Sequence, residues 1–200
     1  MSRVSFVFLI VVFILFSCEK KITDEQFEQN VFSEIILKVV DSTYQDYRIL
    51  TIVPEMGERI YDKNGKWIGR SLIGQRERDL KRKAKAEVFI KDSLNLIIAI
   101  GTGGLINDKT ELQNYNSPKF KFKHLSELPA DENYKNWAAK YPKFAGALVF
   151  SNINFDVSKI NGTLNVSYYC GTRCGLGYVV TIKKINNKWV ISKVENSWIA

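Results

Sequence analysis

Alternation of apolar and polar residues is clearest towards the C-terminus, where it predicts an antiparallel meander. Residues 163–170 place apolar side chains at every second position, as in a strand with one buried face. Residues 177–185 and 188–195 have the composition of two further strands, and residues 147–153 that of a preceding one. The C-terminal quarter of the chain is therefore predicted to form an antiparallel sheet whose consecutive strands are joined by short turns.

The pair Asn186 and Asn187 predicts the turn between the last two strands, because asparagine tolerates the positive φ angles of a tight hairpin. A turn of two residues also sets the pairing across the hairpin. The expected cross-strand pairs are Ile182 with Ile191 and Val179 with Val194.

A different period near the N-terminus predicts an amphipathic helix over residues 24–41. Thr23 and Gln26 have the spacing of a capping box, and the acidic residues that follow Thr23 suit the positive end of the helix dipole. The apolar stripe that would cover one face of a sheet consists of Phe27, Val31, Phe32, Ile35, Ile36 and Val39.

The middle of the chain gives shorter signals. The residues around an Asn-Gly pair at 64–65 predict a hairpin, and Pro142 is expected to end a short helix over 131–141. Residues 101–104 are expected to form a turn, since they lack the spacing of a phosphate-binding loop. The β-prone runs expected to be strands are 47–53, 88–90 and 94–100.

Residues 76–85 carry six basic and two acidic side chains, and two interpretations follow. Such a run can bind nucleic acid, but it is more often the solvated face of a helix or loop. The solvated face is favoured here because the N-terminus of the chain indicates export, and we expect no nucleic-acid partner.

Residues 1–17 resemble a bacterial export signal: Arg3 precedes an apolar core over 4–16, which is too short for a typical membrane span. Cys18 follows a small residue, as at the lipidation site of bacterial lipoproteins, although Leu15 and Phe16 depart from the usual pattern. The resemblance implies a lipid on Cys18 and anchoring by acyl chains. An ordinary secretory signal with an incidental cysteine and an uncleaved anchor helix are the alternatives.

Cleavage after residue 17 would remove one charge, that of Arg3, and lower the net charge from +8 to +7. The expected organisation is a signal peptide over 1–17, a tether over 18–23 and a single domain over 24–200. Cys170 and Cys174 would then be the two remaining cysteines, and in an oxidising compartment they are expected to form a disulfide that closes a hairpin loop.

Other chemistries of this cysteine loop are less well matched. A redox dithiol has two residues between its cysteines, and a zinc site needs four ligands, whereas this chain adds only one histidine, His124. His124 is expected at the surface among Lys121, Lys123 and Glu127. An anion-binding nest remains open, and its residues would be Gly171, Arg173, Gly175 and Gly177.

The segments 151–156, 169–171, 174–178, 188–189 and 198–199 resemble the C-terminal part of a group of uncharacterised bacterial lipoproteins and secreted proteins. That group combines a Cys-Gly-x-x-Cys-Gly-x-Gly loop with a terminal Lys-Trp strand. The resemblance covers about a quarter of the chain, and it implies an architecture without implying an activity.

These features predict an α+β domain, in which an N-terminal amphipathic helix packs on a mainly antiparallel sheet. A helix-on-sheet fold of the nuclear-transport-factor-like type is one candidate, by analogy of architecture alone. The function expected is that of an envelope-anchored lipoprotein that binds an envelope protein or a small ligand, without cofactor or metal. The alternative is a hydrolase of an envelope glycan that uses carboxylates such as Asp131, Glu132 or Asp156.

Overall fold

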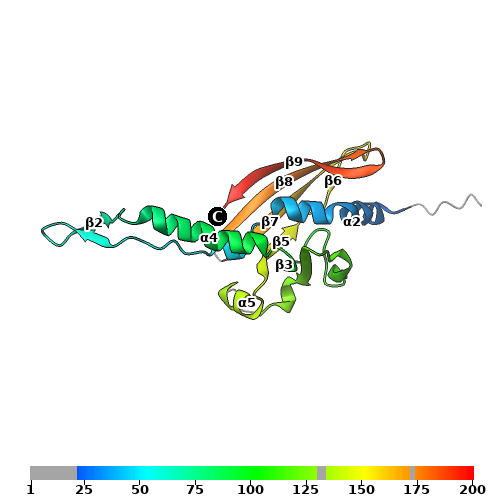
Figure 1. Ribbon diagram of the computed structural model, residues 1–200. Helices are drawn as coiled ribbons and strands as arrows, with labels where there is room; N and C mark the ends of the chain where they lie inside the picture. The colour runs from blue at the N-terminus through cyan, green and yellow to red at the C-terminus, as the bar shows by residue number, and fades with distance from the viewer. Residues whose placement is uncertain (1–21, 130–133, 172–173) are drawn as a thin grey trace, which may run out of the picture.

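The computed structural model describes residues 22–129, 134–171 and 174–200, and it places a helix-covered sheet beside a long projection (Figure 1). The helices are α2 (Asp24–Thr43), α3 (Tyr47–Leu50), α4 (Gln75–Lys91), α5 (Tyr134–Lys140) and the 3₁₀ turns η1 (Leu112–Tyr115) and η2 (Leu125–Glu127). The strands are β1 (Arg59–Tyr61), β2 (Trp67–Arg70), β3 (Leu96–Ile100), β4 (Phe120–His124), β5 (Phe144–Phe150), β6 (Asn154–Phe155), β7 (Asn161–Gly171), β8 (Cys174–Ile185) and β9 (Lys188–Ile199).

Within the described ranges the main sheet has seven strands, and the order β4-β3-β5-β7-β8-β9 with β6 beside β7. The pairs β3 with β4 and β3 with β5 are parallel, while the remaining pairs are antiparallel. The predicted α+β class with a mainly antiparallel sheet and a C-terminal meander is therefore confirmed.

Strand β7 shows the predicted alternation, since its even positions from Gly162 to Cys170 are buried and Asn165 and Tyr169 on the other face are exposed. The turn between β8 and β9 is also as predicted, because Asn186 and Asn187 have φ angles of 49° and 60°. These strands form the long meander of the sheet.

The register across β8 and β9 is only partly as predicted. Ile182 does lie opposite Ile191, but Val179 lies opposite Glu195, and Val180 takes Val194 as its partner. The reason is a β-bulge at Ser192, where one extra residue in β9 displaces the following pairs by one position, up to a second irregularity between Tyr178 and Gly177. The Ser192 hydroxyl donates to the carbonyl of Thr181 at 3.1 Å, which satisfies part of the interrupted ladder.

Helix α2 begins as the sequence predicts. The Thr23 hydroxyl accepts from the backbone N–H of Gln26 at 3.2 Å, and the Gln26 side chain accepts from the N–H of Thr23 at 3.1 Å. The predicted stripe is buried apart from Phe27, which is half-buried and packs its ring 5.0 Å from Phe155 and 6.3 Å from Trp189. These contacts fix α2 across one face of the sheet.

Two predicted strands are helical instead. Residues 47–50 form α3, because the Asp46 carboxylate caps the backbone N–H of Arg48 at 3.0 Å and starts a helical turn. Residues 88–90 are the last turn of α4, which continues until Asp92 ends it. In both segments the capping residue and the neighbouring structure outweigh the β propensity of Ile and Val.

Other predictions from the middle of the chain are met more closely. The hairpin at the Asn-Gly pair is present as β1 and β2, residues 96–100 form β3, and residues 76–85 lie on α4. The short helix before Pro142 is α5, although the predicted residues 131–133 lie outside the described residues.

The single histidine of the chain, His124, is half-buried at the end of β4 and not at the surface as predicted. Its Nε2 lies 2.8 Å from the carbonyl of Thr110, while its backbone N–H donates to Glu127 at 2.8 Å. Thr110 therefore lies against the ring, and η1, which follows it in the chain, packs beside β4.

Tyr168 is the largest fully buried side chain in the core of the described residues. Its hydroxyl donates to the carbonyl of Ala145 at 2.9 Å, and its ring lies where a Cβ at Gly146 would stand. Gly146 has a φ of 127°, so both the backbone angle and the ring require glycine there. Burial raises the pKa of the Tyr168 hydroxyl, which therefore stays protonated.

No helix in the described part of the chain is both long and apolar enough to cross a membrane.

We expect Tyr168→Phe to lower the free energy of unfolding by about 1 to 2 kcal/mol, because a buried hydrogen bond is lost. Urea denaturation would measure the change. Tyr169→Phe is the matched control, since Tyr169 lies on the exposed face of the same strand. Equal effects of the two substitutions would contradict the role given to the buried hydroxyl.

Candidate interaction arm

Residues 51–91 form a projection that leaves the body of the molecule, and we call these residues the arm (Figure 1). The chain runs outward in an extended segment, reverses in the hairpin of β1 and β2, and returns as α4. Strands β1 and β2 pair only with each other among the described strands. The arm therefore lies outside the main sheet and its core.

Local interactions explain how the tip of the arm forms. The Asp62 carboxylate accepts from the backbone N–H groups of Asn64 and Lys66 at 2.8 and 2.9 Å, and Gly65 takes a φ of 76°. Further back, the Arg78 guanidinium donates to the carbonyls of Ser71 and Ile73 at 3.2 and 2.6 Å. These bonds join the hairpin to the start of α4.

The arm has little apolar burial of its own. None of the seventeen residues of α4, all of which are described, is buried. An isolated two-stranded hairpin is at best marginally stable in water, because it has no hydrophobic face to cover. Most apolar side chains of the arm are thus left in contact with water.

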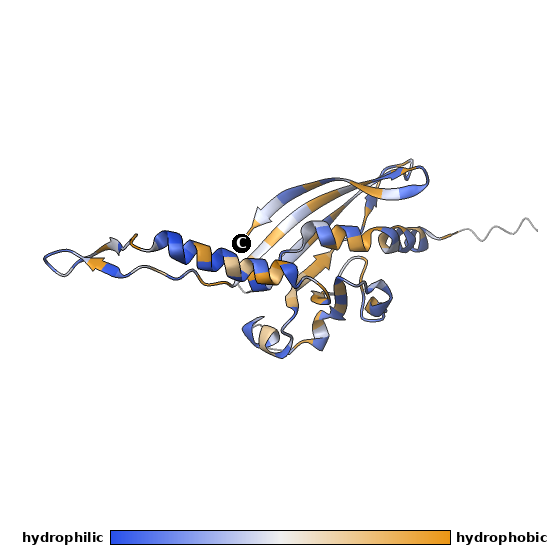
Figure 2. Ribbon diagram, in the orientation of Figure 1, coloured by the Kyte–Doolittle hydropathy of each residue, from blue (hydrophilic) through white to orange (hydrophobic). Residues whose placement is uncertain are grey.

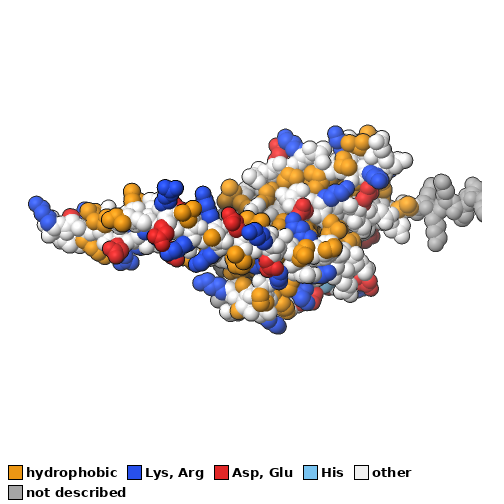
Figure 3. Space-filling view, in the orientation of Figure 1, with side chains coloured by type: hydrophobic (Ala, Val, Ile, Leu, Met, Phe, Trp, Pro, Cys, Tyr) orange, Lys and Arg blue, Asp and Glu red, His pale blue; other side chains and the backbone are white. Residues whose placement is uncertain are grey.

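The ribbon of the arm carries hydrophobic residues among hydrophilic ones (Figure 2), and hydrophobic side chains are seen on its surface (Figure 3). The arm holds eleven of the twenty-one large hydrophobic residues that are exposed in the described chain. These eleven are Val53, Met56, Ile60, Tyr61, Trp67, Ile68, Leu72, Ile73, Leu80, Val88 and Ile90, of which Ile73 is 87 % exposed and Leu72 75 %. Such a concentration on one projection is typical of an interaction site.

The arm is also basic. Residues 51–91 hold eleven Lys or Arg and six Asp or Glu, so their net charge is +5, whereas the net charge of the whole chain is +8. Only Lys81, with Glu77 at 3.0 Å, forms an ion pair with another described residue. The other ten cations of the arm have no such partner, which leaves its positive potential uncompensated.

Two shallow grooves run along the arm beside α4. One, of about 410 Å³, has Ile49, Ile52, Pro54 and Ala86 among its apolar lining and Arg82 and Lys83 among its polar lining. The other, of about 500 Å³, is lined by Gln75, Arg76, Asp79, Leu80 and again Lys83. Both grooves thus combine apolar surface with a net positive charge.

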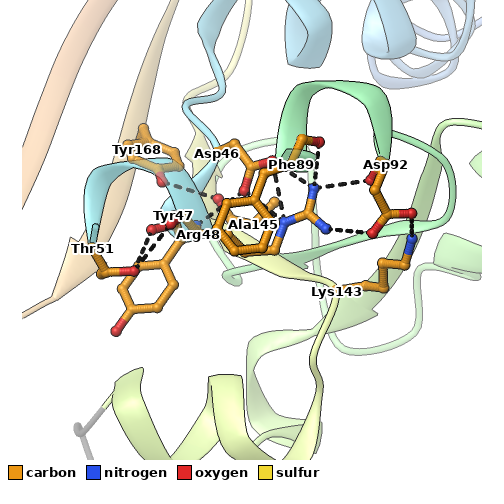
Figure 4. A network of polar contacts seen from close by, with 9 residues as sticks. All are labelled: Asp46, Tyr47, Arg48, Thr51, Phe89, Asp92, Lys143, Ala145 and Tyr168. Atoms are coloured by element: carbon orange, nitrogen blue, oxygen red, sulfur yellow. Dashed lines mark hydrogen bonds and ion pairs between the residues drawn. The ribbon is translucent and has the colours of Figure 1, made fainter. Parts of the chain in front are cut away.

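The base of the arm is held by Arg48, which is 7 % exposed (Figure 4). Its guanidinium donates to the Asp46 carboxylate at 2.7 Å and to the Asp92 carboxylate at 3.1 Å. It also donates to the carbonyls of Phe89 and Asp92 at 3.3 and 3.1 Å, so it closes the C-terminal end of α4. The Phe89 ring lies under the guanidinium at 5.1 Å.

Neighbouring charges favour the charged forms of Arg48 and Asp92. Burial by itself lowers the pKa of Arg48, but the hydrogen bonds and charges of Asp46 and Asp92 outweigh it and raise the pKa above its ordinary value. The ion pair with Lys143, just before β5, lowers the pKa of Asp92. Arg48 and Asp92 therefore connect α3, the end of α4 and the start of β5.

The cysteines predicted to form a disulfide lie within bonding distance, with the Cα atoms of Cys170 and Cys174 5.0 Å apart. They join the end of β7 to the start of β8, as the sequence predicts. Gly171 lies beside them with a φ of 152°, while Arg173 lies outside the described residues.

Gly175 and Gly177 have a packing role in β8. The indole of Trp198 from β9 lies against both, and a Cβ at either position would overlap it. The ring of Tyr169 lies 6.0 Å from that of Trp198, centroid to centroid. Both glycines are paired with β7, Gly177 also pairs with Trp198 of β9, and Gly175 exchanges backbone hydrogen bonds with Ala200, so their backbone groups take part in the sheet. Anion binding at this loop stays a prediction.

The carboxylates proposed from sequence for hydrolysis are only partly visible. Asp131 and Glu132 lie outside the described residues, as does Cys18. Asp156 accepts from the Asn161 side chain at 2.7 Å and from the backbone N–H of Ile160 at 3.1 Å, which lowers its pKa to about 2. Asp156 is therefore ionised at neutral pH and organises the turn between β6 and β7.

Asp156 lies in a half-open depression of about 490 Å³ at the start of α2, with Asp24, Glu28 and Lys159. Lys159 pairs with Asp24 at 2.5 Å, and Glu28 accepts from the backbone N–H of Ile153. No group of three or more His, Cys, Asp or Glu side chains suited to a metal ion occurs in the part of the chain that is described.

No family model, curated protein or solved structure matches this chain. The resemblance to uncharacterised lipoproteins and the nuclear-transport-factor-like architecture therefore stay predictions. The sequence predicts a hairpin and a solvated basic run, but not that the two form one projection. The signal for it in the sequence is that the basic run follows soon after two apolar pairs, Trp67 with Ile68 and Leu72 with Ile73.

We expect Arg48→Met to lower the free energy of unfolding by about 3 kcal/mol, because it leaves the Asp46 carboxylate buried and unpaired. Urea denaturation would measure this loss, and limited proteolysis would show faster cleavage within residues 51–91. Lys81→Met, which removes an exposed ion pair of the same arm, is the control and should change stability by less than about 1 kcal/mol. A fully stable Arg48→Met protein would refute the anchoring role.

Proposed function

We propose that this protein is a lipoprotein anchored in the bacterial envelope through Cys18, and that it acts as a non-enzymatic binding module whose contact surface is the arm. The observation that carries the proposal is the concentration of exposed apolar side chains on a projection with net charge +5. A projection of this kind is suited to contact, because it offers apolar area that is already exposed and needs no opening of the core.

The arrangement of the molecule supports this proposal. Helix α2 begins at one end, and the arm extends from the body at the other end (Figure 1). A lipid on Cys18 would lie six residues before Asp24, so the anchor and the arm would occupy opposite ends of the molecule. The body, held together by the sheet and α2, would lie between the anchor and the arm.

Carboxylate-dependent hydrolysis of a glycan stays the alternative. The described carboxylate among its predicted residues, Asp156, has a pKa of about 2 and three hydrogen-bond donors within its own turn. A general acid at neutral pH needs a raised pKa, so the chemistry of Asp156 favours the binding module.

Expression of the full chain in a bacterial host tests the anchor. We expect mass spectrometry of the mature protein to find an acylated Cys18 as the first residue, and membrane fractionation to retain it. A Cys18→Ala variant is the control and should lose both properties. An N-terminus at any other residue in the parent protein would remove the anchor from the proposal.

Site-specific photo-crosslinking in intact cells tests the arm as the contact surface. A photoreactive residue in place of Trp67, which is 58 % exposed, should form covalent adducts with other components of the envelope. The same residue in place of Val157, which is fully exposed on the turn between β6 and β7, is the matched control and should give few. Equal adduct yields at the two positions would contradict an arm-specific contact.

A further inference from the structure

We propose that the arm docks on the surface of an anionic phospholipid bilayer. This inference rests on the proposed function, because that function places the protein at a membrane. Three observations carry it: the aromatic and apolar hairpin, the unpaired cations that surround it, and the grooves that combine both kinds of surface.

The hairpin has the side chains that favour the boundary between water and lipid. Tyr61 lies directly opposite Trp67 across the two strands, and both are more than half exposed. Tyrosine and tryptophan are enriched at membrane interfaces, because each combines an apolar ring with a polar group. Ile68, Leu72 and Ile73 add exposed aliphatic surface next to this pair.

The cations of the arm need an external anion. Arg59 and Arg70 lie opposite each other in the hairpin, and like charges at such positions repel. Neither forms an ion pair with any described residue, and the same holds for Arg76, Arg82 and Lys83. Lipid phosphates would supply the missing charge to all five, and their attraction would add to apolar insertion.

The grooves beside α4 match the two parts of a phospholipid. Arg82 and Lys83 line the same groove as apolar residues such as Ile52 and Pro54. The cations would bind a lipid phosphate, while the apolar residues contact the first carbons of an acyl chain. A second copy of this chain fits less well, because its arm carries the same +5 charge. The complementary surface is thus anionic and apolar at once.

The test uses the full lipidated chain in proteoliposomes, with an environment-sensitive fluorophore on Ile73→Cys. Val157→Cys is the matched control, since both side chains are almost fully exposed and Val157 lies on the body. In vesicles that contain phosphatidylglycerol, we expect the label at position 73 to shift to the blue and to be quenched by brominated lipids. In pure phosphatidylcholine it should remain in water, as the label at position 157 should in both.

A set of charge variants tests the electrostatic part. Arg76→Gln, Arg82→Gln and Lys83→Gln together should lower the docking constant by about a hundredfold, given the usual attraction of each cation to an anionic surface. The matched control removes three exposed lysines at the far end of β8 and β9, by Lys183→Gln, Lys184→Gln and Lys188→Gln, and should leave docking unchanged.

Contrary results of the quenching measurements overturn the inference. Quenching at position 73 no greater than at position 157 would mean that the arm does not dock on lipid, and equal quenching in both lipids would remove the anionic requirement. A concentration-dependent shift without phosphatidylglycerol would assign the arm to a second copy. Failure of lipidation at Cys18 refutes the anchor alone, because docking can still be measured by adding vesicles to the unanchored chain.

Discussion

The buried guanidinium of Arg48 is the interaction on which the arrangement of this protein depends. It lies at the junction of α3, the end of α4 and, through Asp92 and Lys143, the start of β5 (Figure 4). A buried cation is tolerated only when its partners hold it on several sides, and here two carboxylates and two carbonyls do so. The position of the arm is therefore set at its base, since β1 and β2 pair only with each other among the described strands and no residue of α4 is buried.

The body and the arm are stabilised by different interactions. In the body, α2 and the sheet enclose side chains such as Phe32, Ile98 and Tyr168, and burial of apolar surface supplies the driving force. In the arm, capping bonds at Asp62 and Arg78 maintain a hairpin and a helix that bury almost nothing. Burial of this exposed apolar surface against a partner would be favourable, because it removes the surface from water. This is the physical basis of the binding-module proposal.

The glycine-rich cysteine loop has a structural explanation that does not depend on chemistry. Cys170 and Cys174 join β7 to β8, and Gly175 and Gly177 leave room for the indole of Trp198. The rare residues of this segment thus serve the register and the packing of the meander. The arm, with its exposed apolar side chains and its positive charge, is the better candidate for a binding surface.

Elements whose signals are local could be predicted from the residues alone. The stripe of α2, the capping box at Thr23, the alternation of β7 and the turn at Asn186 all depend on residues within a few positions of each other. Tertiary structure decided what depends on distant neighbours. The cap at Asp46 made α3 from a β-prone run, the bulge at Ser192 shifted the register of β9, and β3 found parallel partners in β4 and β5. The exposure of Trp67 and Ile73 belongs to the same class, because a side chain is exposed only when no other part of the fold covers it, and no local pattern of residues encodes that absence.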